Sequence, residues 1–216
     1  MQRFLFGPEE HGLHEGEVSA SSSRELARLF EQAKECHNCT LAASRLNVVF
    51  GEGNPFAEVA IIGEAPGAEE DASGRPFTGR SGQLLDTMLH AAGFSRQELY
   101  ICNILKCRPP GNRNPLKDEV ESCMPWLLEQ LQIVRPKVIL ILGKVAANTI
   151  FDNRLSLGAM RGKMKAWRGF DCCVTFHPAA VLRNPHLKKE WMEDMQLMRD
   201  HCETIGRKKN VRENEN

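Results

Sequence analysis

Apolar residues gather in four short runs along the chain, and three of the four segments that follow them are rich in polar residues, glycine or proline. The runs are EVAII (58–62), LYICNIL (99–105), KVILIL (137–142) and CCVTF (172–176). They are nearly uninterrupted, which is typical of strands that are buried on both faces in a parallel sheet. The pattern therefore predicts four buried parallel strands.

Between and around these strands, apolar residues recur at spacings of three or four, which indicates amphipathic helices. The predicted helices cover about residues 24–33, 81–92, 116–134, 144–151 and 186–202. The alternation of strands and helices places helices on both faces of the sheet. We therefore predict an α/β fold, a three-layer αβα structure with a central four-stranded parallel sheet.

The two ends of the chain lack this pattern. Residues 1–22 are polar and end in a serine-rich stretch, and residues 206–216 are almost wholly charged or polar. We expect both segments to be flexible. A single domain is expected over residues 23–205, because a chain of 216 residues suits one α/β domain with a sizeable core.

Composition limits the class of protein. No apolar run approaches the roughly 20 residues of a membrane helix, and the N-terminus has no extended apolar stretch typical of a secretory signal. We therefore expect a cytoplasmic protein without a membrane partner. We also expect a monomer.

The 28 Lys and Arg balance the 28 Asp and Glu, so a nucleic-acid surface would have to be local. The basic runs LKCRPPGNRNPLK and RGKMKAWRG are candidates, and they fit solvated loops equally well.

Eight cysteines in a cytosolic chain argue against disulfides and for a metal site, a cluster or buried thiols. Cys36 and Cys39 form a CxxC pair, whereas Cys107 and Cys123 are widely spaced. A zinc site usually takes two close pairs, while a 4Fe–4S cluster tolerates the wider spacing. Spacing alone leaves a cluster, a zinc site and unligated thiols open. The remaining cysteines are expected to be small buried hydrophobic side chains: Cys102, Cys172, Cys173 and Cys202.

The polar segments lie at the ends of the strands where ligands bind in open parallel sheets. They are GEAPGAEED, KCRPPGNRNP, GKVAAN and HPAAVLRNP, and Asn103 lies near the end of the second strand. The topology brings these segments to one edge of the sheet. We predict that the active site lies at this edge.

Five motifs occur in the order GEGNP, GEAPGAEEDASGRPFTGRSGQLLD, NILKCRPPGNRNP, CMPWL and HPAAVLRNP. With the cysteines so placed, about residues 36–198 closely resemble family 4 uracil-DNA glycosylases, the iron–sulfur branch of that superfamily. The resemblance implies a structural 4Fe–4S cluster held by Cys36, Cys39, Cys107 and Cys123. It also implies an enzyme that releases uracil from single- or double-stranded DNA and leaves an abasic site.

The resemblance implies roles in base recognition for three residues. Phe77 would stack on the flipped base, although from the sequence alone it also fits a core anchor. Asn103 would read uracil, because its amide can accept from N3–H and donate to O4. His177 would bond to uracil O2 and stabilise the departing anion. A base-binding turn is expected at four positions: Gly63, Ala65, Pro66 and Gly67.

Cleavage also needs an acid near the sugar, which counters positive charge and orients water. Glu64 is the first candidate because it follows the turn glycine of the motif, and Glu70 is the second. Asn112 would help to place the water. Glu69 and Asp71 are expected to be solvated acids at the start of the next segment.

The HPAAVLRNP segment resembles the intercalation loop of the superfamily. Leu182 would fill the space left by the flipped nucleotide, with Arg183 near the backbone. From the sequence alone, Leu182 fits an anchor at a helix start equally well. Two other classes of function remain: a noncatalytic module of the same fold that binds damaged DNA, and a zinc or iron–sulfur redox protein.

Overall fold

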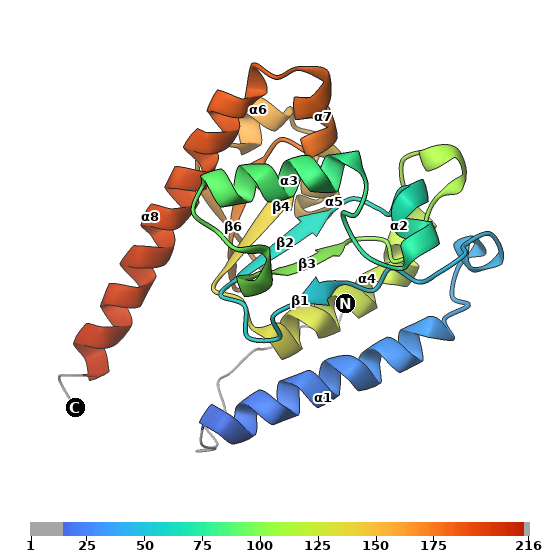
Figure 1. Cartoon of the computed structure of the whole chain (residues 1–216), viewed down its shortest axis with the longest axis horizontal. Coiled ribbons are helices and arrows are strands. Elements are labelled where there is room, and N and C mark those ends of the chain that lie inside the picture. Colours follow the sequence, from blue (N-terminus) through green and yellow to red (C-terminus); the bar gives the residue numbers. More distant parts are fainter. Residues whose placement is uncertain (1–14, 214–216) are drawn as a thin grey trace.

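The computed structural model describes the backbone of residues 15–213 and the side chains of residues 21–205. A six-stranded sheet forms its middle layer, in the order β1-β3-β2-β4-β6-β5 (Figure 1). The strands are β1 (Glu52–Gly53), β2 (Val59–Gly63), β3 (Tyr100–Asn103), β4 (Val138–Leu142), β5 (Met164–Trp167) and β6 (Phe170–Thr175).

The four central strands β3, β2, β4 and β6 are parallel, which confirms the predicted core of the sheet. The edge strands β1 and β5 pair antiparallel with β3 and β6 and were not predicted. β1 has only two residues, and the side chains of β5 are half-buried or exposed. Neither strand therefore contains an apolar run.

Helices cover both faces of the sheet, and all five predicted helices are present. They are α1 (Glu15–Lys34), α3 (Arg80–Ala91), α4 (Lys117–Val134), α5 (Lys144–Phe151) and α8 (Leu187–Glu213). Three short helices were not predicted: α2 (Ala68–Ser73), α6 (Leu157–Met160) and α7 (Pro178–Arg183). Short 3-10 turns span Thr40–Ala43, Arg96–Glu98 and Pro110–Asn112.

Two separate apolar clusters hold the three layers together, one on each face of the sheet. On one face, α1, α4 and α5 pack on strand residues such as Ile62 and Ile139. On the other face, α3 and α8 pack on the alternate strand residues, such as Ile61 and Leu140. Side chains point to opposite faces in turn along a strand, so a run of apolar residues supplies both clusters.

The terminal helices are longer than predicted. α1 begins at Glu15, within the segment predicted to be flexible, and α8 continues to Glu213. The rest of the two predicted flexible ends, residues 1–14 and 214–216, lies outside the described residues. Over the part of the chain that the structure describes, no helix combines the length and apolar character that crossing a bilayer requires.

Asp71 corrects a prediction, because it is a buried anchor rather than a solvated acid. It is 2% exposed, and its Oδ1 accepts hydrogen bonds from the backbone N–H groups of Leu46 and Asn47 at 3.0 and 3.3 Å. Glu69 is exposed, as predicted. The Asp71 contacts join α2 to the segment that follows the CxxC pair, two parts of the chain whose proximity no local pattern indicates.

Candidate active site

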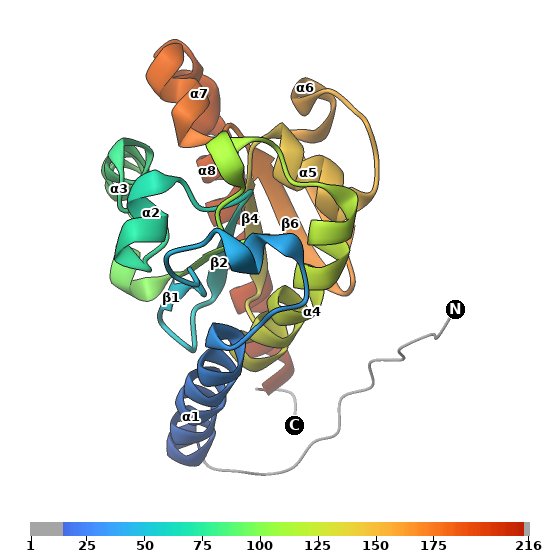
Figure 2. The same ribbon diagram turned by 90° about the vertical axis from the view of Figure 1, so that its right-hand side faces the viewer.

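The carboxyl ends of the central strands open into one cleft of about 750 Å³. Figure 2 shows α2, α5 and α7 around this end of the sheet, and each of these helices contributes lining residues. Ten predicted site residues line the cleft: Glu64, Ala65, Pro66, Gly67, Glu70, Phe77, Asn103, Asn112, His177 and Arg183. The prediction that the four polar segments meet at one edge is therefore confirmed.

Gly63 brings an amide and an aromatic ring together at the base of the cleft. It is the register partner of Asn103 across β2 and β3. A Cβ atom at Gly63 would lie 2.2 Å from Asn103 Oδ1 and 2.6 Å from Phe77 Cζ. Only a hydrogen atom fits there, so glycine is required for this close approach.

Asn103 presents an unsatisfied acceptor. The residue is 2% exposed, and its Oδ1 has no hydrogen-bond partner within the described part of the chain. Its backbone carbonyl accepts a bond of 2.7 Å from Nζ of the buried Lys106. Most buried polar atoms are paired, so this side-chain oxygen is suited to accept a hydrogen bond from a ligand.

Phe77 is held in an uncommon backbone conformation. Its φ is +53°, in the left-handed region that bulky residues seldom adopt. The side chain is 6% exposed, and its ring centroid lies 5.8 Å from that of His177, with 33° between the two planes. The two rings therefore form adjoining walls of one pocket.

His177 has a defined protonation state. It is the N-cap of α7, and its Nδ1 accepts a hydrogen bond of 3.1 Å from the N–H of Ala179. Burial, with a smaller effect of the Arg183 charge, lowers the pKa of His177 to about 4. The ring is therefore neutral at pH 7 with its proton on Nε2, because Nδ1 acts as an acceptor.

The two candidate carboxylates have different surroundings. Glu64 is half-buried, and no hydrogen bond to its carboxylate is found among the described residues. Burial raises the pKa of Glu64.

Glu70, by contrast, uses both oxygens for bonds to backbone. Its Oε1 accepts from Thr78 N and Gly79 N at 3.1 and 2.9 Å, and its Oε2 accepts from Gly67 N at 3.0 Å.

The remaining predicted residues lie at the rim. The Oδ1 of Asn112 accepts a bond of 2.7 Å from Arg108 Nε, so this oxygen is already engaged. Leu182 projects from α7 and is 40% exposed, and Arg183 is exposed beside the cleft.

The predicted cluster ligands also come together. Cys36, Cys39, Cys107 and Cys123 line one cavity of about 20 Å³. Among the described residues, no three His, Cys, Asp or Glu side chains have the arrangement that binds a single metal ion. Cys102, Cys172 and Cys173 are buried in the sheet, and Cys202 is half-buried.

Hydrogen-bond donors lie close to two of the four sulfur atoms. Arg45 Nη1 donates to the carbonyl of Cys36 at 2.7 Å and to Cys107 Sγ at 3.5 Å. The backbone N–H of Lys106 donates to Cys123 Sγ at 3.2 Å. Such donors stabilise thiolates, so this set of residues fits a thiolate-bound cluster.

Comparisons with known proteins agree with this arrangement. The model of the Uracil DNA glycosylase superfamily matches residues 50–197. A type-4 uracil-DNA glycosylase of Pyrobaculum aerophilum is 42% identical over 181 residues, which cover 80% of this chain and 92% of that protein. The chain belongs to the type-4 uracil-DNA glycosylases.

Other members of this family are similarly related. The type-4 uracil-DNA glycosylase of Thermotoga maritima is 42% identical over 180 residues, 82% of this chain and 94% of that protein. The type-4 uracil-DNA glycosylase of Archaeoglobus fulgidus is 39% identical over 185 residues, 82% of this chain and 93% of that protein.

Sequence reasoning missed several residues of this type-4 site. Gly143 lies at the end of β4 with φ +91°, and a Cβ there would be 2.9 Å from His177 Cβ. A glycine directly after a buried strand was the available signal for this close approach. Two basic residues, Arg80 and Lys144, also line the cleft without having been predicted, and they lie beside Arg113 of the candidate basic run LKCRPPGNRNPLK.

Arg113 is fixed by an acid on α4. It forms a two-bond pair with Glu119, at 2.9 and 2.5 Å, and the Glu119 side chain is fully buried. Hydrogen bonding to Arg113 lowers the pKa of Glu119 despite its burial. The loop between β3 and α4 is therefore anchored at the rim of the cleft.

Proposed function

We propose that this protein hydrolyses the N-glycosidic bond of uracil in DNA, releasing free uracil and leaving an abasic site. The observation that carries the proposal is the buried Oδ1 of Asn103, which has no hydrogen-bond partner among the described residues and lies in the cleft that Phe77 and neutral His177 also line. A pocket with few, convergent polar groups beside an aromatic face suits a planar base. The names of the type-4 relatives support the same substrate.

Base recognition follows from the groups at the end of β2 and β3. An enzyme acting on a base in DNA must take it out of the stack and bind its edge and face. The Phe77 ring stacks on the face of the base. Asn103 Oδ1 accepts from uracil N3–H while its amide N–H donates to O4, and cytosine is refused because it presents the reverse pattern.

His177 stabilises the leaving group. As the glycosidic bond breaks, negative charge develops on uracil, and a donor aimed at O2 lowers the energy of that state. The proton on Nε2 is available for this bond because Nδ1 is occupied by Ala179 N–H. The low pKa of His177 keeps the ring neutral at pH 7, so a neutral imidazole donates this bond from Nε2–H.

Glu64 acts on the sugar side of the bond. Glu64 lines the cleft, and its carboxylate accepts no hydrogen bond from the described residues, so its lone pairs are available to substrate and water. An ionised carboxylate there counters the positive charge on the sugar and orients the attacking water. Glu70 serves instead to position the backbone, because its oxygens accept three N–H bonds.

DNA contacts are assigned to the rim. Leu182 is the exposed apolar wedge that replaces the flipped nucleotide in the stack. Arg80, Arg113, Lys144 and Arg183 surround the cleft and supply positive charge for phosphates of single- or double-stranded DNA.

Cys36, Cys39, Cys107 and Cys123 would hold a 4Fe–4S cluster in a structural role. The cluster would supply no step of base release. Its four ligands come from the segment after α1, the loop after β3 and helix α4, so it would join these parts beside the DNA-binding rim. We place the protein, as a monomer, in the cytoplasm, where thiols stay reduced.

The test is incubation with a uracil-containing oligonucleotide, followed by alkali and separation of the strands. Alkali-labile sites at uracil, with free uracil released and no cleavage before alkali, are expected. Binding without labile sites would identify a noncatalytic module and overturn the proposal. Iron, sulfide and zinc analysis of the same sample distinguishes a cluster from a zinc site.

A further inference from the structure

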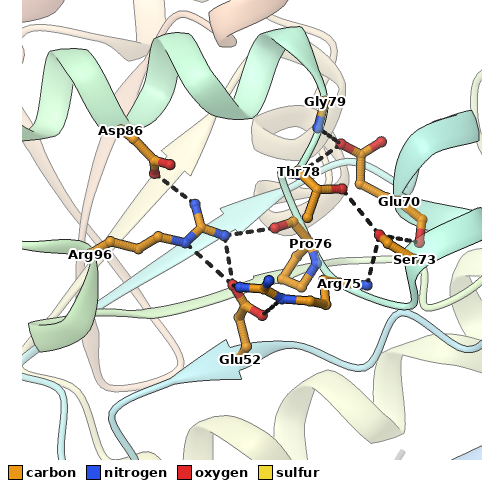
Figure 3. A network of polar contacts seen from close by, with 9 residues as sticks. All are labelled: Glu52, Glu70, Ser73, Arg75, Pro76, Thr78, Gly79, Asp86 and Arg96. Carbon is orange, nitrogen blue, oxygen red and sulfur yellow. Dashed lines mark hydrogen bonds and ion pairs between the residues drawn. The ribbon is translucent and has the colours of Figure 1, made fainter.

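The base-stacking residue sits on a segment that polar side chains hold from both sides. Two peptide groups flank the Cα of Phe77, and their orientations set its φ and ψ. The carbonyl of Pro76 belongs to the first group, and the N–H of Thr78 belongs to the second. Each forms a hydrogen bond to a side chain from another part of the chain (Figure 3).

Arg96 binds the group before Phe77. This residue lies in the 3-10 turn before β3, and its Nη2 donates to the Pro76 carbonyl at 2.7 Å. Glu70 binds the group after Phe77 through Thr78 N. With both peptide groups fixed, the left-handed conformation of Phe77 is retained although it is unfavourable for this residue type.

Two carboxylates orient the Arg96 guanidinium. Glu52 on β1 accepts from Nη2 and Nε at 2.8 and 3.3 Å, and Asp86 on α3 accepts from Nη1 at 2.7 Å. A planar guanidinium can bond to three separate groups at once, whereas a lysine ammonium lacks this fork. The Arg96 side chain is 23% exposed, so its geometry is set by the protein rather than by solvent.

We propose that Glu52 and Arg96 are positioning residues for uracil recognition, which hold the Pro76 carbonyl so that the Phe77 ring faces the base. The proposal rests on the proposed function. Neither residue lines the cleft, so both would act through Phe77 rather than on the substrate. The two-residue strand β1 thereby gains a role beyond extending the sheet.

Arg75 provides a matched control. It also binds Glu52, at 2.8 and 3.2 Å, but its side chain is 64% exposed. Among the hydrogen bonds of the described residues, the Pro76 carbonyl accepts one from Arg96 and none from Arg75. Arg75→Gln therefore removes one ion pair of Glu52 and one positive charge while leaving the bond to Pro76 in place.

The experiment is a double-mutant cycle on the single-turnover rate of uracil release, measured with enzyme saturating over DNA. Arg96→Gln is expected to lower the rate about tenfold in the protein with Phe77. In the Phe77→Ala background it should change the rate less than about twofold, because the ring it positions is gone. Arg75→Gln should stay within about twofold of the parent protein.

Equal losses from Arg96→Gln in both backgrounds would overturn the proposal, as would equal losses from Arg75→Gln and Arg96→Gln. If Arg96→Gln does not fold, Glu52→Gln is tested in the same cycle, with the same expectation and the same contrary result. Thermal unfolding and the DNA dissociation constant are measured for each variant. An inactive parent protein would refute the proposed function. An active parent protein in which the effects of Arg96→Gln and Phe77→Ala on the rate are independent would refute this inference alone.

Discussion

At the scale of single residues, hydrogen bonding distinguishes the two candidate catalytic carboxylates, Glu64 and Glu70. Glu70 accepts hydrogen bonds from three backbone N–H groups, whereas Glu64 lines the cleft and its carboxylate accepts none from the described residues. A carboxylate that is to act on substrate must have lone pairs available. We therefore expect the two acids to respond in opposite ways to substitution.

Glu64→Gln should lower the single-turnover rate by about 10²- to 10⁴-fold, the range for loss of a positioned catalytic carboxylate. The fold should be unaffected, and stability at pH 7 should be equal or higher, because burial raises the pKa of Glu64 and makes its charge unfavourable. Glu129→Gln, which removes an exposed acid of α4 that does not line the cleft, is the control. A rate within about tenfold of the parent would contradict the role of Glu64.

The pH profile gives an independent check of Glu64. The ionised form is the active one, so the rate should fall as pH falls through the raised pKa of this acid. In Glu64→Gln that decrease should disappear down to about pH 4, where His177 gains its proton. An unchanged acid limb in the variant would show that another group titrates.

His177→Ala should lower the rate by about 10²- to 10³-fold, as expected for loss of a donor to a developing anion. The decrease in rate at low pH should be the same in His177→Ala as in the parent protein, because His177 is already neutral above its pKa of about 4. The measurement is the single-turnover rate between pH 4.5 and 8, values chosen to lie above that pKa. Disappearance of the limb would assign it to the histidine instead.

At the scale of elements, Glu70 joins the turn after β2 to the segment that leads into α3. Glu70→Gln replaces one acceptor oxygen with an N–H donor, so at least one of the three part-buried backbone N–H groups loses its partner. We expect the free energy of unfolding to fall by about 1–3 kcal/mol. Urea denaturation of Glu70→Gln beside Glu64→Gln measures this, and equal stability of both would contradict the anchoring role.

The sequence predicts elements well where the pattern is long and periodic. The strands of the sheet centre and the five main helices follow from apolar runs and spacings of three or four. The short helices α2, α6 and α7 have six residues or fewer, too few for a helical period to emerge, and β1 and β5 contain no continuous apolar run. Their formation depends on tertiary contacts such as the pairing of Glu52–Gly53 with β3.

The same limit applies to the site. Motifs and strand ends identify the cleft residues, because parallel strands bring their carboxyl ends to one edge. They do not indicate the contacts between distant parts of the chain. Glu52 and Arg96 are 44 residues apart, and Asp71 reaches back 25 residues to Leu46. Burial, which assigns a neutral state to His177, is also a property of the folded chain alone.

At the scale of the whole molecule, the cavity with four cysteines lies where the end of α1, the loop after β3 and helix α4 meet. We expect about four iron and four sulfide per chain. Cys39→Ser should lose most of the iron and lower the unfolding temperature, because a ligand of the cluster is removed. Metal analysis and thermal unfolding measure both effects.

Cys202→Ser on α8 is the control for this substitution, because Cys202 does not line the cavity. It should keep the full iron content. Stoichiometric zinc in the parent protein, or full iron in Cys39→Ser, would contradict the assignment of the ligands.

Gly63 has a consequence for protein engineering. One added methyl group at this position would collide with both the Asn103 amide and the Phe77 ring, so the end of β2 has no free volume to redesign. A library intended to accept larger or modified bases should keep Gly63 constant. Diversity belongs at lining residues with small or apolar side chains, such as Ala68 on α2 and Val145 on α5.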